Sequence, residues 1–459
     1  MHKLLDYALK YAEKQHALQA EALAVKSEVL TLIIEKNDVK TIEHKRDQGL
    51  GVRVITKKFG KQYIGSAFTL NLNKKSIEEI IKNAIQSSRF RKIDFSNASF
   101  PISKTVQAIK DIYDAKIPVI NPEQLMEVGK LIVESASIDE KINSINGHLT
   151  LISYWVYLAN SLGLQAGYPA TIYNVSIEAI AQSLNELYSG EEDYISRVFN
   201  EEKAYQTARA AALTALSQLN SKQIKGEVMD VILAPEATSE LLMHTLCQEI
   251  KADMIQKNQS PLSGKINQEV SSNLVTIIDD GKVEGAVGSK PYDDEGTSTE
   301  TKTIIEKGIL KTYLYDAFSA AREGKKPSGN SLRQSSEIIR KYAVEPQAAP
   351  TNLIIKPGTE NFESLVENVK KGIYVKNVIG AHTSNAVTGE FSVVALTAYK
   401  VENGEIKFPV KNAMIAGNIL EFLKKINGVG KNQKQCQSLS IDSSIITPCI
   451  RVKEVAVSA

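Results

Sequence analysis

A histidine and a cysteine three residues apart are the first candidates for metal chemistry in this sequence. His244 and Cys247 share one face of an expected helix, so an imidazole and a thiolate could give zinc two ligands. Cys436 or Cys449 would then complete the site. The alternative is a packing role, with Cys247 as a small apolar residue and His244 at a domain or dimer surface. Single His and Cys residues on amphipathic helices usually pack, so we favour this alternative.

Asp293, Asp294 and Glu295 form the densest group of carboxylates in the chain. Carboxylate oxygens are the ligands that hard cations prefer. Adjacent residues of an extended chain point to opposite sides, however, so these three cannot converge on one ion without ligands from distant segments. We therefore predict a charged turn before Gly296 that leads into a strand. The rim of a cleft is one location that suits such a turn.

A loop rich in Gly, Ser and Thr contains Asn385, Thr388, Gly389 and Glu390. Such a loop suits the lining of a cavity or the binding of an extended peptide backbone. A structural turn would explain the same composition, and the sequence leaves both interpretations open.

Two common catalytic signatures are missing from the sequence. Gly49 and Gly51 lack the third glycine of a dinucleotide-binding loop and follow no parallel βαβ unit. No GxSxG sequence occurs, which removes the commonest signature of a serine hydrolase.

The first half of the chain must position these residues with a mixture of helices and strands. Apolar residues at helical spacing predict helices, and β-branched runs bounded by turn residues predict strands. The expected helices lie at 1–18, 76–88, 125–135 and 205–219, and Asn121 and Pro122 favour the start of the third. The expected strands lie at 28–36, 41–46, 49–56, 62–68, 142–151, 154–159 and 170–179.

The second half shows short alternating segments separated by turn signals such as Lys307-Gly308 and Asn403-Gly404. This pattern predicts antiparallel sheet, as a sandwich or partly closed barrel. A strand at 228–233 and helices at 239–256 and 362–371 are also expected. The fold class is therefore α+β, with a mixed α/β N-terminal domain (1–223, with a connector near 100–120) and a β-rich, mainly antiparallel C-terminal domain (224–459).

Composition and charge exclude several functional classes. The 55 basic residues offset 53 acidic ones, so we predict no nucleic-acid partner. No apolar run approaches the ~20 residues that span a membrane, and charges interrupt the N-terminal helix, unlike a signal peptide. The three cysteines have no close CxxC spacing, which fits a reducing compartment. These features predict a cytoplasmic protein.

Four landmarks, in this order and spacing, make the sequence resemble the TldD/PmbA metallopeptidase family over nearly its whole length. They are DQGLGVRV at 47–54, GSKPYDDEGTSTETKTIIEKGILKTYLYDAFSA at 288–320, SGNSLR at 328–333 and TSNAVTGEFSVVALTAYKVENGEI at 383–406. The run NAVTGEFS at 385–392 resembles the PmbA/TldE branch more than the TldD branch.

The resemblance also locates a zinc motif that this chain lacks. In the catalytic branch, HExxxH on the helix after the first C-terminal strand provides two zinc ligands and a general base, and a cysteine near the C-terminus provides a third ligand. The ligand positions correspond here to Met243 and Gln248, and the base position to His244. A thioether and a carboxamide are poor zinc ligands. We therefore predict no metal in this chain and no independent hydrolysis.

The resemblance implies a non-zinc subunit of a TldD/TldE-type protease that acts on small unfolded peptides, such as leader peptides and antitoxins. A zinc-bearing TldD-like paralogue would be its partner in a dimer that encloses a shared cavity, although the sequence leaves a homodimer open. One alternative is an active metallopeptidase homodimer with His244, Cys247 and Cys436 as unconventional ligands. Another is a regulatory binding protein of the gyrase-modulator type.

Overall fold

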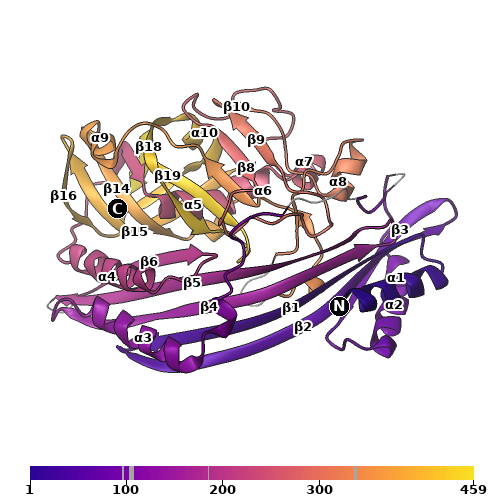
Figure 1. Cartoon of the computed structure of the whole chain (residues 1–459). Coiled ribbons are helices and arrows are strands. Elements are labelled where there is room, and N and C mark those ends of the chain that lie inside the picture. Colours follow the sequence, from indigo (N-terminus) through magenta and orange to yellow (C-terminus); the bar gives the residue numbers. More distant parts are fainter. Residues whose placement is uncertain (96–97, 103–107, 184–185, 335–338, 459) are drawn as a thin grey trace.

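Long strands from the first half of the chain form a curved six-stranded antiparallel sheet, which runs beneath the second half (Figure 1). The computed structural model describes residues 1–458 apart from 96–97, 103–107, 184–185 and 335–338. The strand order is β3-β2-β1-β4-β5-β6. The strands are β1 (Gln19–Glu35), β2 (Asp38–Lys58), β3 (Lys61–Thr69), β4 (Ile142–Asn160), β5 (Gln165–Ser183) and β6 (Glu186–Ser196).

The strands are longer than the sequence pattern predicts. The separate strands expected at 41–46 and 49–56 are one strand of 21 residues, β2. Gly49 and Gly51 do not turn the chain, because both lie inside the β1–β2 register. They make room for Tyr342 instead: a Cβ at Gly51 would lie 2.1 Å from the carbonyl oxygen of Tyr342.

Helices α1 (His2–Lys14), α2 (Lys74–Ser88), α3 (Pro122–Ala136) and α4 (Glu201–Ser217) cover one face of this sheet. Alternate β1 residues face them, with Ala22 and Ala24 against α1 and α2, and Leu30 and Leu32 against α3 and α4. The helix start predicted near Pro122 is confirmed, because Asn121 caps α3 with a reciprocal capping box. All four predicted helices of the first half are present.

The second half contains an 11-stranded sheet, part of which closes into a barrel. Strands β7, β14, β15, β17 and β19 pair in a ring, since β19 pairs with both β17 and β7. Most pairs are antiparallel, as predicted, but β14–β7 and β13–β19 are parallel. The strands of this sheet are β7 (Glu227–Leu233), β8 (Ile277–Asp280), β9 (Thr301–Glu306), β10 (Ile309–Leu310), β13 (Asn352–Ile355), β14 (Lys371–Ile379), β15 (Glu390–Glu402), β16 (Glu405–Val410), β17 (Met414–Asn418), β18 (Ile426–Gln437) and β19 (Ser444–Ser458). Two short strands, β11 (Ser331–Leu332) and β12 (Gln347–Ala348), pair separately.

Two predicted helices of the second half need correction. The helix expected at 239–256 is broken into α5 (Pro235–His244), α6 (Leu246–Glu249) and α7 (Ala252–Gln256). Thr245 has non-helical angles (φ −116°, ψ −92°), and extended Lys251 pairs with Leu314. The helix expected at 362–371 ends earlier, as α9 (Phe362–Glu367), because Lys371 and Gly372 begin β14. The remaining helices are α8 (Ala317–Arg322) and α10 (Ile419–Lys424).

The face of the first sheet opposite its helices packs against the second half of the chain. Leu23, Val25 and Val29 of β1 share a core with Val287 and Tyr292. Residue 223, where we predict the domain boundary, lies between α4 and β7. No helix among the described residues is long and apolar enough to cross a membrane.

Candidate binding cavity

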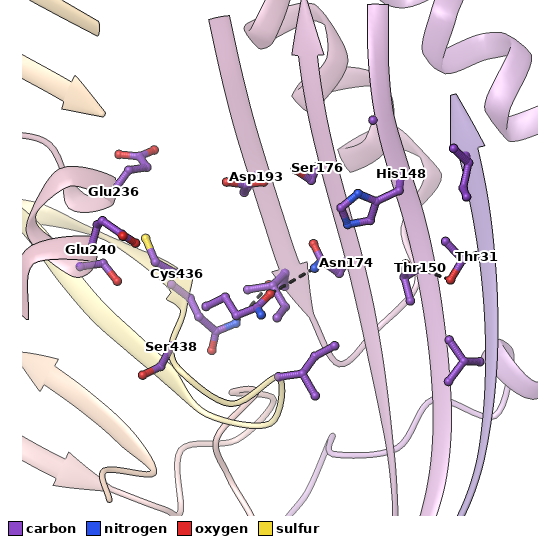
Figure 2. A pocket seen from close by; sticks show the side chains of 18 of the residues that line it. Thr31, His148, Thr150, Asn174, Ser176, Asp193, Glu236, Glu240, Cys436 and Ser438 are labelled. Atoms are coloured by element: carbon purple, nitrogen blue, oxygen red, sulfur yellow. Dashed lines mark hydrogen bonds between the residues drawn. The ribbon is translucent and has the colours of Figure 1, made fainter. Parts of the chain in front are cut away.

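A cavity of about 930 Å³ lies between the first sheet and the second half of the chain, beside their shared apolar core. Side chains from β1, β2, β4, β5 and β6 form one wall, and α5 with β18 and the residues after it form the other. Figure 2 shows the two walls facing each other, with polar side chains on both. A cavity of this size with convergent polar groups is typical of a ligand-binding site.

Antiparallel register sets the polar residues of the sheet wall. Ile33, His148, Ser176 and Asp193 are cross-strand neighbours on β1, β4, β5 and β6. Residues of one register row point to the same face of a sheet, so all four line the cavity. A second row contains Thr31, Thr150, Asn174 and Ile195, and the hydroxyls of Thr31 and Thr150 lie 3.3 Å apart.

The opposite wall is acidic along α5. Glu236, Ser239, Glu240 and Met243 occupy positions three and four residues apart, which places them on one face of a helix, toward the cavity. Pro235 begins this helix at its first turn. Cys436 on β18 lies beside this face (Figure 2).

Burial, together with nearby carboxylates, favours the protonated form of the Cys436 thiol. Burial raises its pKa to about 12, and the nearby carboxylates of Glu236 and Asp193 contribute. Lys434 lowers the pKa of the thiol, but its ammonium group also pairs with two carboxylates. It lies 2.6 Å from a carboxylate oxygen of Glu236 and 3.8 Å from one of Glu192. A neutral thiol is a poor nucleophile, so this cysteine has no evident covalent role.

The three residues that we predict at the zinc-motif positions lie in different surroundings. Met243 lines the cavity. His244 points toward Glu240, with Nε2 3.5 Å from the carboxylate, and its ring centre is 6.4 Å from that of His382. Gln248 lies beyond the helix break and accepts a hydrogen bond of 2.6 Å from Lys251.

The residues present do not fit a zinc site. The shared helical face that we expected for His244 and Cys247 is wrong, because the helix breaks at Thr245 between them. Cys247 belongs to the apolar core, and burial raises its pKa to about 12. Cys436 lines the cavity, whereas Cys247 does not. Among the described residues, no three His, Cys, Asp or Glu side chains are grouped as a metal ion requires.

Asn385, Thr388, Gly389 and Glu390 form a closed turn, in which all but the buried Gly389 are exposed. The side chain of Asn385 accepts hydrogen bonds from the backbone N–H groups of Val387 and Thr388, and the backbone N–H of Asn385 donates to the carbonyl oxygen of Glu390. Gly389 has φ +80°, which favours glycine. These residues are not among those that line the cavity, so their role in peptide binding stays a prediction.

Asp293, Asp294 and Glu295 form a turn, as predicted, but not at an exposed rim. All three are at most 1% exposed. Asp294 pairs with Lys341 at 2.7 Å, and Lys341 and Lys290 both pair with Asp442. The strand expected immediately after Gly296 begins only at Thr301. The cluster therefore forms a buried ionic network.

Sequence reasoning missed the polar rows of the sheet wall. His148, Ser176 and Asp193 come from three strands, and only the register brings them together. The available signal was the alternation of polar and apolar residues in each strand, but it does not give the register between strands.

Comparisons with known proteins find matches to one protein family along most of the chain. Family models described as PmbA/TldA metallopeptidase domain 1, central domain and C-terminal domain match residues 20–88, 116–219 and 225–459. A metalloprotease of Methanocaldococcus jannaschii is 30% identical over 408 residues, which cover 88% of this chain and 87% of that protein. A metalloprotease TldD homolog of Haemophilus influenzae is 25% identical and covers 99% of this chain and 93% of its own length.

A solved structure has the same fold. The crystal structure of TldE from Thermococcus kodakarensis superposes with a TM-score of 0.87 at 22% sequence identity, and the match covers 99% of this chain and 100% of that one.

Proposed function

Because the chain belongs to the TldD/PmbA family of metallopeptidases, we propose that it is the non-zinc subunit of a TldD/TldE-type protease. Its role is to bind peptide and to form part of a shared cavity, while a zinc-bearing TldD-like partner carries out hydrolysis. The substrates are small unfolded peptides, such as leader peptides and antitoxins, and the complex works in the cytoplasm. The observation that carries this proposal is the cavity. It is supported by the family resemblance, which assigns Met243, His244 and Gln248 to the positions of the zinc motif.

A metal-free chain can still contribute to cleavage through binding. The two walls of the cavity offer uncharged polar groups from the sheet, such as Thr150 and Asn174, and carboxylates from α5. A peptide held between the walls loses translational and rotational freedom before it reaches a catalytic group. Correct orientation can lower the activation free energy of cleavage by several kcal/mol, on the order of half the ~7–11 kcal/mol measured for ideal intramolecular reactions.

Assembly is the second element of the proposal. Hydrophobic side chains remain exposed on the second half, among them Val387 and Met414. A dimer would cover such residues and the unpaired edges of the sheets. Light scattering should give a dimer mass at micromolar concentration, alone or with the TldD-like partner. A monomer mass in both samples would contradict this element.

Substitutions in the mixed complex test the division of labour. Met243→Ala and His244→Ala should leave the rate constant of peptide cleavage unchanged, because no transition-state charge is stabilised from this chain. Asn385→Ala, which opens the exposed turn, should instead weaken peptide capture or assembly, seen as a higher KM or a smaller dimer fraction. A large loss of kcat in His244→Ala would contradict the proposed binding role.

A further inference from the structure

Two carboxylates in the cavity lack a basic partner. In the part of the chain that the structure describes, no Lys or Arg lies within ion-pair distance of Glu240 on α5 or Asp193 on β6. Among the described residues, the one basic group within 4 Å of the Glu240 carboxylate is the imidazole of His244, at 3.5 Å, and His244 does not line the cavity. The nearby ammonium of Lys434 is already held by Glu236 and Glu192.

A buried hydroxyl adds an independent sign of an unmet interaction at the same place. Ser239 lies on the cavity-facing side of α5, between Glu236 and Glu240, and is only 2% exposed. Its Oγ is close enough to the Cys436 thiol for a weak hydrogen bond that lowers the pKa of the thiol, but it has no oxygen or nitrogen partner in the described structure. Buried hydroxyls normally have a partner.

We propose that the cavity binds an organic ammonium group of a peptide, between Glu240 and Asp193. This inference rests on the proposed function, because it specifies which peptides the cavity accepts. The ammonium can come from a free amino terminus or from a lysine side chain. Either forms charge-assisted hydrogen bonds to carboxylates, which are stronger than neutral ones.

Three features favour an organic cation over a metal ion. The carboxylates lie on opposite walls (Figure 2), and among the described residues they belong to no group that could coordinate a metal directly. The cavity, at about 930 Å³, has room for several peptide residues around the charged group. The neutral hydroxyls of Ser176 and Thr150 on the sheet wall can accept or donate hydrogen bonds to the peptide backbone.

The environment of Asp193 is consistent with this assignment. Desolvation by the cavity walls raises the pKa of its carboxyl group, although the residue is accessible to solvent and a hydrogen bond with Ser176 opposes the shift. The other charged groups that act on it are Lys434, Glu192 and His148, and of these Lys434 is already paired. An arriving ammonium would stabilise the carboxylate.

Binding of short labelled peptides to the full-length chain, without any partner, tests the proposal. Fluorescence anisotropy would compare an unfolded peptide containing lysine with its amino-acetylated form, with a form whose lysines are acetylated, and with one that carries both modifications. The doubly modified peptide should bind at least about tenfold more weakly, and the singly modified peptides show which ammonium is recognised. Glu240→Gln and Asp193→Asn should each weaken binding of the unmodified peptide by about tenfold.

Glu421→Gln is the matched control, because Glu421 is an exposed carboxylate paired with Lys424 and does not line the cavity. It should leave the affinity unchanged. Equal binding of unmodified and doubly acetylated peptides would overturn the ammonium site, as would displacement of the peptide by millimolar Mg²⁺ or Ca²⁺ alone. Cleavage by the mixed complex is measured separately. Lost ammonium selectivity with intact cleavage refutes only the site, and absent cleavage with intact selectivity refutes only the subunit role.

Discussion

Arg53 on β2 and Glu295 in the buried turn are 242 residues apart in the sequence and form an ion pair of 2.8 Å. The same guanidinium donates two hydrogen bonds to Glu21, and Arg333 also pairs with Glu21. Although burial opposes ionisation, Arg53 lowers the pKa of Glu295 below its usual value. The network therefore joins the first sheet to the second half of the chain beside their apolar core.

Removing Arg53 should destabilise the protein strongly. In Arg53→Met, Glu21 and Glu295 remain buried near each other without this cation, so the free energy of unfolding should fall by about 3–5 kcal/mol. Arg46→Met is the control, because Arg46 forms an exposed pair with Glu28, worth about 0–1 kcal/mol. Chemical denaturation measures both. Equal effects of the two substitutions would contradict a structural role for the network.

Gly51→Ala tests the close approach of the chain at Tyr342. The added Cβ would lie 2.1 Å from the backbone oxygen of Tyr342, so a strand must move, at a cost of about 1–3 kcal/mol. In the control Gly417→Ala, the nearest atoms are at an ordinary 3.6 Å, and stability should hardly change. The midpoints of thermal unfolding compare the two. An unchanged midpoint for Gly51→Ala would show that the contact is not tight.

Glu249 should make stability depend on pH. Its carboxyl group is buried without a hydrogen-bond partner in the described structure, and burial raises its pKa to about 8. The unfolded chain releases this proton near pH ~4.3, so stability is fully present below that pH and is lost as the pH rises to about 8. Glu249→Gln removes this loss.

The prediction for Glu249 is tested by measuring the free energy of unfolding of the unsubstituted chain and of Glu249→Gln from about pH 4 to about pH 8. The advantage of Glu249→Gln should be near zero at about pH 4 and largest from about pH 8 upward. Glu306→Gln, at an exposed position, should follow the unsubstituted chain. A constant difference at all pH values would show that Glu249 does not titrate between them.

The purified chain should carry no stoichiometric zinc. Met243 and Gln248 are poor ligands, and Cys247 lies in the core. Elemental analysis of the chain, before and after mild chelation, measures this, with Cys247→Ser as the comparison. Zinc that survives chelation in the unsubstituted chain and disappears in Cys247→Ser would instead support a site at His244 and Cys247.

The sequence predicted those parts of the fold that depend on local pattern. Helix α2 was predicted from the apolar stripe Ile77, Ile80, Ile81 and Ala84, and the start of α3 from Asn121 and Pro122. Predictions from the local sequence pattern were wrong where a residue distant in the sequence determines the local structure. We predicted a break between the strands at 41–46 and 49–56, but β2 is continuous there. Its Gly49 and Gly51 leave space for Tyr342, which is nearly 300 positions later in the printed sequence.

The site was predictable only in part for the same reason. The positions Met243, His244 and Gln248 followed from the family resemblance, but not the break of the helix at Thr245 between them. The second break, at Lys251, was also missed, because it involves a pairing with the distant Leu314. The acidic turn at Asp293 was expected near solvent because its cationic partners, Arg53 and Lys341, are remote in sequence. Pairing between strands that are distant in the sequence also forms the sheet wall of the cavity.

Peptide cleavage by three samples tests the central claim most directly: this chain alone, its TldD-like partner alone, and their mixture, each with and without a zinc chelator. We expect cleavage of an unfolded peptide by the mixture, its loss on chelation, and none by this chain alone, because our proposal assigns the zinc to the partner and Met243 and Gln248 are poor zinc ligands. Robust, chelator-sensitive cleavage by this chain alone would contradict the account.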